Sequence, residues 1–220
     1  MRVLELFSGT GSVGKVCKKT GFDVLSVDID PSHAPDLNMD IMDFDETMYP
    51  TDAFQFIWAS PPCEAYSVAR TNVLGDREVD MQKADDLVRK TLEIVRYFGQ
   101  ASWCIENPAT SRLWTRDVTI GLATHSVMPR SCCVTSYCSY GTRYRKNTRI
   151  SNSIGLVLER CPGEGKCPSM VGSRHMERAQ QGSGGAYGSK RHTRDELHSI
   201  PSGLVEEILS QVVKARDAAY

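Results

Sequence analysis

The sequence has no long apolar run and almost no imbalance of charge. No stretch approaches the roughly 20 consecutive apolar residues that a membrane-spanning helix needs. The 26 basic and 27 acidic side chains give a formal net charge of -1, so a nucleic-acid-binding surface would have to be local. The first residues lack the charged stretch and apolar core of a signal peptide. We therefore expect no membrane partner and a soluble, intracellular protein.

Regular cysteine spacing and internal repeats are also missing. The eight cysteines are irregularly placed in a chain of 220 residues, which fits a reducing compartment better than a disulfide scaffold. Hydrophobic residues make up 40% and charged residues 24%, an ordinary globular balance that argues against disorder. The length suits one medium domain with a small appendage.

Hydrophobic patterning predicts alternating strands and helices in the first half of the chain. Short apolar runs predict strands over residues 3–7, 22–27, 54–59 and 101–105. Helical periodicity predicts helices over 12–20 and 81–98, each ended by a glycine. This alternation indicates an α/β fold, a doubly wound and mostly parallel sheet covered on both faces.

The second half of the chain is less regular. Strands are predicted over 132–140 and 149–158, followed by a stretch rich in glycine, serine and charge. A final helix is predicted over 203–219. We therefore expect a compact domain over residues 1–158, an irregular insertion over 159–199, and a C-terminal helix over 200–220 that packs on the compact domain.

A glycine-containing loop, residues 7–12 (Phe-Ser-Gly-Thr-Gly-Ser), joins the first strand to the first helix. Glycines let the backbone turn tightly and approach a ligand, and the amides of a helix N-terminus face it. Asp28 ends the second strand, where its carboxylate could bind ribose hydroxyls. Asp40 and Ile41 could contact the edge of an adenine ring. Ordinary turn and capping roles are the alternative, but the acidic ends of two strands favour a nucleoside cofactor.

Two further motifs end predicted strands. Ser60-Pro61-Pro62-Cys63 places a cysteine behind two prolines that fix the backbone, and a thiolate is a good nucleophile. One alternative is a buried structural cysteine. The other is the similar turn of an amino-methyltransferase, in which an aromatic residue follows Ser-Pro-Pro; this chain has cysteine at that position, which disfavours it. Glu106 opens Glu-Asn-Pro after the long helix; a protonated carboxyl there suits donation to a ring nitrogen, although such a glutamate is also typical of a turn.

In this order the glycine loop, Asp28, Asp40, Pro-Pro-Cys and Glu-Asn-Pro resemble the cytosine-C5 DNA methyltransferase family, including its RNA-acting relatives. The resemblance covers roughly residues 1–155 and, in part, the final helix. It implies a Rossmann-like S-adenosylmethionine-dependent methyltransferase fold, S-adenosylmethionine as cofactor, and methylation of carbon 5 of cytosine in DNA. RNA is the alternative substrate, and a non-catalytic nucleic-acid-binding relative is the alternative function.

The resemblance also implies residue roles. Cys63 would attack C6 of the base and Glu106 would engage N3, while Arg145 and Arg149 would hold the base and a phosphate and orient Glu106. The expected cofactor-binding residues are Phe7, Ser8, Gly9, Thr10, Gly11, Asp28, Ile29, Asp40, Ile41 and Pro61. The expected substrate-binding residues are Ser60, Pro62, Ser67, Arg70 and Asn107. Ser67 and Arg70 belong to residues 65–80, which resemble the family's mobile catalytic loop.

The chain departs from the family in three places. The basic run over 140–149 stands where the family has Gln-x-Arg-x-Arg and resembles phage- and virus-type members; a solvated basic turn is the alternative. The long target-recognition segment is missing, which makes 159–199 a reduced recognition region at most. Recognition is therefore expected to be short or weak, or to come from a partner subunit. The family's late Gly-Asn motif is also missing, and residues 200–202 with the final helix would wall the cofactor pocket instead.

We expect no metal in the active site. The sequence also allows a zinc site outside the active site. Its ligands would be Cys161, Cys167 and His175, with Cys132, Cys133 or Cys138 as the fourth. The spacing is not a standard C-x2-C pair, so the pattern favours free thiols in a loop.

Overall fold

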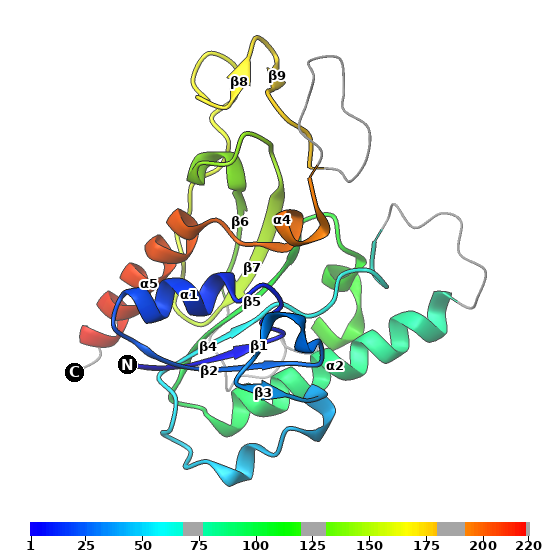
Figure 1. Ribbon diagram of the computed structural model, residues 1–220, viewed down its shortest axis with the longest axis vertical. Helices are drawn as coiled ribbons and strands as arrows, with labels where there is room; N and C mark the ends of the chain where they lie inside the picture. Colours follow the sequence, from blue (N-terminus) through cyan, green and yellow to red (C-terminus); the bar gives the residue numbers. More distant parts are fainter. Residues whose placement is uncertain (68–76, 120–130, 180–191, 219–220) are drawn as a thin grey trace.

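The computed structural model describes residues 1–67, 77–119, 131–179 and 192–218. Its centre is a seven-stranded sheet of order β3-β2-β1-β4-β5-β7-β6 (Figure 1). The strands are β1 (Arg2–Leu6), β2 (Asp23–Asp28), β3 (Leu37–Asn38), β4 (Phe56–Ala59), β5 (Ser102–Pro108), β6 (Ser131–Ser136) and β7 (Asn147–Asn152). Strands β1 to β5 pair in parallel, and β7 runs antiparallel to both β5 and β6. The predicted α/β class with a mostly parallel sheet is confirmed.

Helices cover both faces of this sheet. They are α1 (Ser12–Lys19), α2 (Arg77–Tyr97) and α5 (Ser202–Asp217), while the short helix α4 (Arg194–His198) lies beside the carboxyl ends of the strands. Side chains alternate between the faces of a strand, so Val3 packs with α1 and α5 while Leu4 packs with α2. Helices α1 and α5 lie side by side (Figure 1). In the part of the chain described, no helix combines the length and apolar character needed to cross a bilayer.

Short 3-10 turns connect the main elements. They are η1 (Pro31–His33), η2 (Ile41–Asp43), η3 (Glu46–Met48), η4 (Arg112–Thr115) and η5 (Tyr137–Tyr140). The strand predicted over 132–140 therefore ends at Ser136, where η5 begins. The strand predicted over 149–158 ends at Asn152, because its side-chain oxygen accepts hydrogen bonds from the amides of Ile154 and Leu156 and turns the backbone out of the ladder.

The stretch predicted to be irregular contains a small hairpin and a short helix. Strands β8 (Met170–Val171) and β9 (Arg174–His175) pair antiparallel at the end of the molecule away from α2 (Figure 1). Helix α4 follows after residues 180–191, which lie outside the described residues. Pieces this short do not produce a recognisable periodicity in the sequence.

The strand order determines where a ligand site forms. The chain runs from β1 outward to β2 and β3, then returns to β4 on the other side of β1. Ligands bind doubly wound sheets at such a reversal, outside the carboxyl ends of the strands. The glycine loop after β1 and residues 60–63 after β4 are therefore neighbours, and the end of β5 lies next to them.

Candidate active site

A cavity of about 330 Å³ opens at this reversal point, within the size range of small-molecule sites. The ends of β1, β2, β4 and β5 contribute its wall. Of the residues expected to bind cofactor or substrate or to act in catalysis, those on the wall are Phe7, Ser8, Gly9, Thr10, Asp28, Ile29, Asp40, Ile41, Ser60, Pro61, Pro62, Cys63, Glu106 and Asn107. Two motif groups that are far apart in sequence thus share one space.

The glycine loop has an unusual backbone. Gly9 and Gly11 have φ of +46° and +65°, and Phe7 has φ of +56°, a region that side chains other than glycine rarely occupy. The Gly9 amide donates a 2.7 Å hydrogen bond to Asp28 Oδ2, which ties the loop to β2. Strained residues of this kind cluster at ligand sites. Gly11 is not on the cavity wall; it is the N-cap of α1.

The acidic residues at the far end of the cavity have structural partners. Asp28 Oδ1 accepts from the Asp30 amide at 2.8 Å, and Asp40 accepts from the Met42 amide at 2.9 Å. Asp28 and Asp40 therefore form turns, as one interpretation of the sequence suggests, and both also line the cavity. Ile29 lies between them in sequence and is 67% exposed, which offers an apolar surface beside the carboxylates.

Cys63 is half-buried at the other end of the cavity. Burial, together with the negative charges of Glu64 and Glu106, raises the pKa of its thiol, and the positive charge of Lys146 opposes them. The thiol is therefore protonated at neutral pH in the free protein.

Glu106 and Asn107 fix the geometry around this cysteine. Glu106 is 7% exposed, and the Thr148 hydroxyl of β7 donates a hydrogen bond to its carboxylate. Asn107 Nδ2 donates a 2.8 Å bond to the Pro61 carbonyl, so the end of β5 holds the Pro-Pro turn in place.

Of the basic run over residues 140–149, Lys146 lies on the cavity wall, whereas Arg145 and Arg149 do not. Glu106 pairs with Ile150 in the antiparallel register, so alternation puts Thr148 on the side of Glu106 and Arg149 on the opposite side. Lys146 lines the cavity and donates to the Leu197 carbonyl at 2.7 Å. The Arg149 guanidinium instead lies 5.4 Å from the centre of the Trp114 ring, and Arg145 is exposed away from the wall.

A buried charge network holds the chain just after Cys63. The Tyr66 hydroxyl donates to Asp85 of α2 at 2.8 Å, and Arg116 donates to the same carboxylate at 2.6 and 2.9 Å. Ser67 follows this anchor, and its carbonyl accepts from Arg77 at 2.7 Å; it does not line the cavity. Arg70 and most of the expected catalytic loop lie outside the described residues.

Helix α4 is a part of the site that the sequence did not predict. Arg194 forms an ion pair with Glu64 beside Cys63. Asp195 Oδ2 lies 3.5 Å from His33 Nε2, on the same cavity wall as Asp28. The following residues bond the glycine loop: Ser199 donates to the Thr10 hydroxyl at 3.1 Å, and the Ile200 amide to Ser12 Oγ at 3.1 Å. Ile200 lines the cavity, but Pro201, Ser202 and the residues of α5, which were expected to wall the pocket with it, do not. The available signal was the Thr193–Glu196 capping box.

Glu5 was also missed. It is 1% exposed in β1, lines the cavity, and accepts a 3.0 Å hydrogen bond from the Gly14 amide of α1. Burial is the main cause that raises its pKa to about 7. A side chain at position 14 would collide with this carboxylate, which explains the glycine there. A single acidic residue inside an apolar run was the signal.

One protein of described function aligns with nearly the whole chain. A protein of Frog virus 3 (isolate Goorha), described as a DNA (cytosine-5)-methyltransferase, is 30% identical over 228 residues, covering 95% of this chain and 99% of the viral protein. No protein-family model matches the chain.

Two solved structures share the fold. An E. coli prophage-encoded protein described as a DNA modification methyltransferase aligns over 69% of this chain with a TM-score of 0.52 and 16% identity. The Entamoeba histolytica methyltransferase EhMeth aligns over 73% with a TM-score of 0.53 and 13% identity. The chain matches only 46% and 56% of those two longer chains. The family resemblance inferred from the motifs is confirmed by the viral relative: the chain belongs to the DNA (cytosine-5)-methyltransferase family.

Proposed function

We propose that the protein transfers a methyl group from S-adenosylmethionine to carbon 5 of cytosine in DNA, with Cys63 as nucleophile. The observation that carries this proposal is the single cavity that holds Cys63 and Glu106 at one end and the glycine loop at the other. The family of the viral relative supports the same reaction and substrate.

The far end of the cavity suits a nucleoside cofactor. Exposed Ile29 offers an apolar face to an adenine ring, and the carboxylates of Asp28 and Asp40 have lone pairs left for hydroxyl and amino groups. The space beyond the Gly9 Cα is open, so a ligand can approach the backbone there. These features support Phe7 to Thr10, Asp28, Ile29, Asp40, Ile41 and Pro61 as the cofactor-binding residues.

The chemistry of the chain's own residues follows from their positions. A flipped cytosine is needed because carbon 5 cannot be reached in the stack. The Cys63 thiol releases its proton to solvent as its sulfur bonds to C6, while Glu106 takes up a proton from solvent and shares it with N3, which makes the ring a better electrophile. S-adenosylmethionine, when bound, supplies the methyl group to the activated C5. Loss of the C5 proton then breaks the S–C6 bond and frees Cys63.

Lys146 takes the role expected of the two arginines. Its half-buried ammonium group on the cavity wall suits the base O2 or a neighbouring phosphate, and it favours the Cys63 thiolate. Because the region before α5 is short, we further propose that target recognition is limited or supplied by a partner subunit.

A methyl-transfer assay with product analysis tests this function. The protein is incubated with labelled S-adenosylmethionine and either unmethylated duplex DNA or tRNA, and the nucleosides are identified by mass spectrometry. We expect 5-methyldeoxycytidine from DNA, and a loss of at least about 1,000-fold in Cys63→Ala. Cys132→Ser, which changes an exposed cysteine outside the cavity, should retain activity.

Each other product overturns part of the proposal. N4-methylcytosine or N6-methyladenine would identify an amino-methyltransferase, and label in tRNA alone would identify an RNA enzyme. DNA binding with no transfer by the wild type would identify a non-catalytic binding protein.

A further inference from the structure

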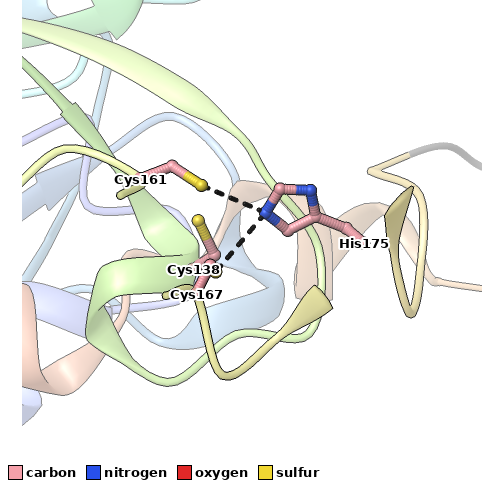
Figure 2. Close-up of side chains that lie close together, drawn as sticks. All are labelled: Cys138, Cys161, Cys167 and His175. Carbon is pink, nitrogen blue, oxygen red and sulfur yellow. Dashed lines mark hydrogen bonds between the residues drawn. The ribbon is translucent and has the colours of Figure 1, made fainter. Parts of the chain in front are cut away.

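Three cysteines and one histidine converge outside the active site (Figure 2). Cys138 lies in η5, Cys161 in the loop after β7, Cys167 just before β8, and His175 in β9. One sulfur or ring nitrogen from each of the four lies within 4.8 Å of all the others. Figure 2 shows the imidazole directed at the sulfurs of Cys161 and Cys167.

The distances fit a tetrahedral metal ion. The His175 Nε2 atom lies 3.4 Å from Cys161 Sγ and 3.7 Å from Cys167 Sγ. With Zn–S bonds of about 2.3 Å and Zn–N bonds of about 2.0 Å, a tetrahedron separates its sulfur and nitrogen ligands by about 3.5 Å. Cys138 and Cys167 are buried, and the other two are half-buried, so the donors surround an enclosed point.

We propose that Cys138, Cys161, Cys167 and His175 bind one structural zinc ion. Three thiolates and one imidazole make a closed four-ligand set that is typical of structural zinc sites and leaves no position for substrate. This inference does not depend on the proposed methyl transfer.

The surroundings match the charge and hydrogen bonding that such a site needs. The Gly163 amide donates to the Cys161 sulfur, and the Cys167 amide donates to the Gly163 carbonyl at 2.8 Å, which forms a tight turn between two ligands. Zinc with three thiolates carries a net negative charge. The positive charge of Arg145 acts on both Cys161 and His175 and offsets it.

Free thiols, which the sequence spacing favours, give no reason for this convergence. All eight cysteines are free in the structure. A disulfide would join two of the sulfurs and leave the third cysteine and the histidine unexplained. A metal ion accounts for all four side chains.

Zinc would also stabilise one wall of the active site. The hairpin segment contacts the turn between η5 and β7: Ser169 Oγ donates to the Thr142 carbonyl at 2.7 Å, and the Glu177 amide to the Arg143 carbonyl at 3.0 Å. This turn leads directly into Lys146. Metal loss should therefore increase hydrogen exchange in residues 137–146 and 159–179 and leave β1 and α1 protected.

Metal analysis of the full chain tests the proposal. Protein purified under reducing conditions from zinc-supplemented cells should contain about one zinc ion per chain. Cys161→Ser and His175→Ala should lose most of it, His175→Cys should retain it, and Cys132→Ser, outside the cluster, should retain it fully. A folded wild type without zinc, or equal zinc in wild type and Cys161→Ser, would overturn the site.

A second measurement covers the case in which the variants fail to fold. Zinc-free wild type titrated with Co²⁺ should develop the visible absorption of tetrahedral thiolate coordination. In the zinc form Cys138, Cys161 and Cys167 should resist alkylation until a chelator is added, whereas Cys132 should react throughout. Octahedral cobalt spectra, or a disulfide among the three cysteines in reduced protein, would contradict the proposal.

Discussion

The environment of Cys63 favours the protonated form of its thiol in the free protein. Burial, Glu64 and Glu106 all raise the pKa of the thiol, so the thiolate fraction at neutral pH is small and grows as the pH rises. A cytosine that shares its N3 with Glu106 changes one of these charges. In the proposed mechanism, Glu106 would therefore link base binding to activation of Cys63.

Replacing Glu106 separates these two roles. Glu106→Gln removes a negative charge and lowers the pKa of Cys63, so alkylation of Cys63 by iodoacetamide at pH 8 should speed up, by up to about tenfold for one pKa unit. Methyl transfer should fall by about 100-fold, because the shared proton is lost. Peptide mass spectrometry measures the alkylation rate.

Lys146→Met provides the opposite change, because it removes the charge that lowers the pKa of Cys63, and alkylation should slow. Unchanged alkylation in both variants would mean that neither charge acts on the thiol.

At the residue scale, the sequence predicted which residues lie at the ends of strands. It predicted less well which face of a strand each side chain occupies. Cys63 and Glu106 share the cavity because Cys63 follows β4 and Glu106 lies near the end of the neighbouring parallel strand β5, which a motif order can indicate. The choice of Lys146 over Arg145 and Arg149 depends on the pleat of β7 and its register with β5. A basic run without a known register leaves that choice open.

The junction of β1 and α1 depends on a buried carboxyl group. Glu5 bonds the Gly14 amide, and burial raises its pKa from 4.5 to about 7. The folded state then binds this proton more tightly than the unfolded state does. The stability contribution of Glu5 is therefore complete below about pH 4.5 and is lost as the pH rises to about 7.

Glu5→Gln tests this junction by removing the titration while keeping an oxygen acceptor for the Gly14 amide. Between pH 4.5 and 8, the free energy of unfolding of the wild type should fall by about 3 kcal/mol more than that of the variant. Urea unfolding at several pH values measures it. Parallel pH profiles in the two proteins would show that Glu5 does not titrate in this range.

At the element scale, length decided what could be predicted. The four strands and two helices predicted in the first half lie within a few residues of their predicted bounds, because each strand carries a buried apolar run and each helix a helical period. Helix α2 begins at Arg77 rather than 81, since its first turn is polar. The β8–β9 hairpin and α4 are too short for periodicity, and their positions depend on contacts with distant residues such as Glu64 and Thr142.

At the scale of the whole molecule, the end of the described chain completes a site begun at its start. Helix α5 packs beside α1, and residues 199–200 bond the glycine loop. Helix α4 spans the cavity between Glu64 and His33. The exposed ion pairs there add little stability, so their main effect is to position α4 over the cavity.

Covalent trapping of the protein on DNA tests whether Cys63 is the nucleophile. Duplex DNA containing 5-fluorocytosine is incubated with the protein and S-adenosylmethionine, and the products are separated under denaturing conditions. Fluorine at C5 leaves no proton to remove, so the S–C6 bond cannot break. We predict a stable protein–DNA complex whose modified peptide carries the base on Cys63, and no complex with Cys63→Ala. Methyl transfer to cytosine C5 without any adduct, or an adduct on another cysteine, would contradict it.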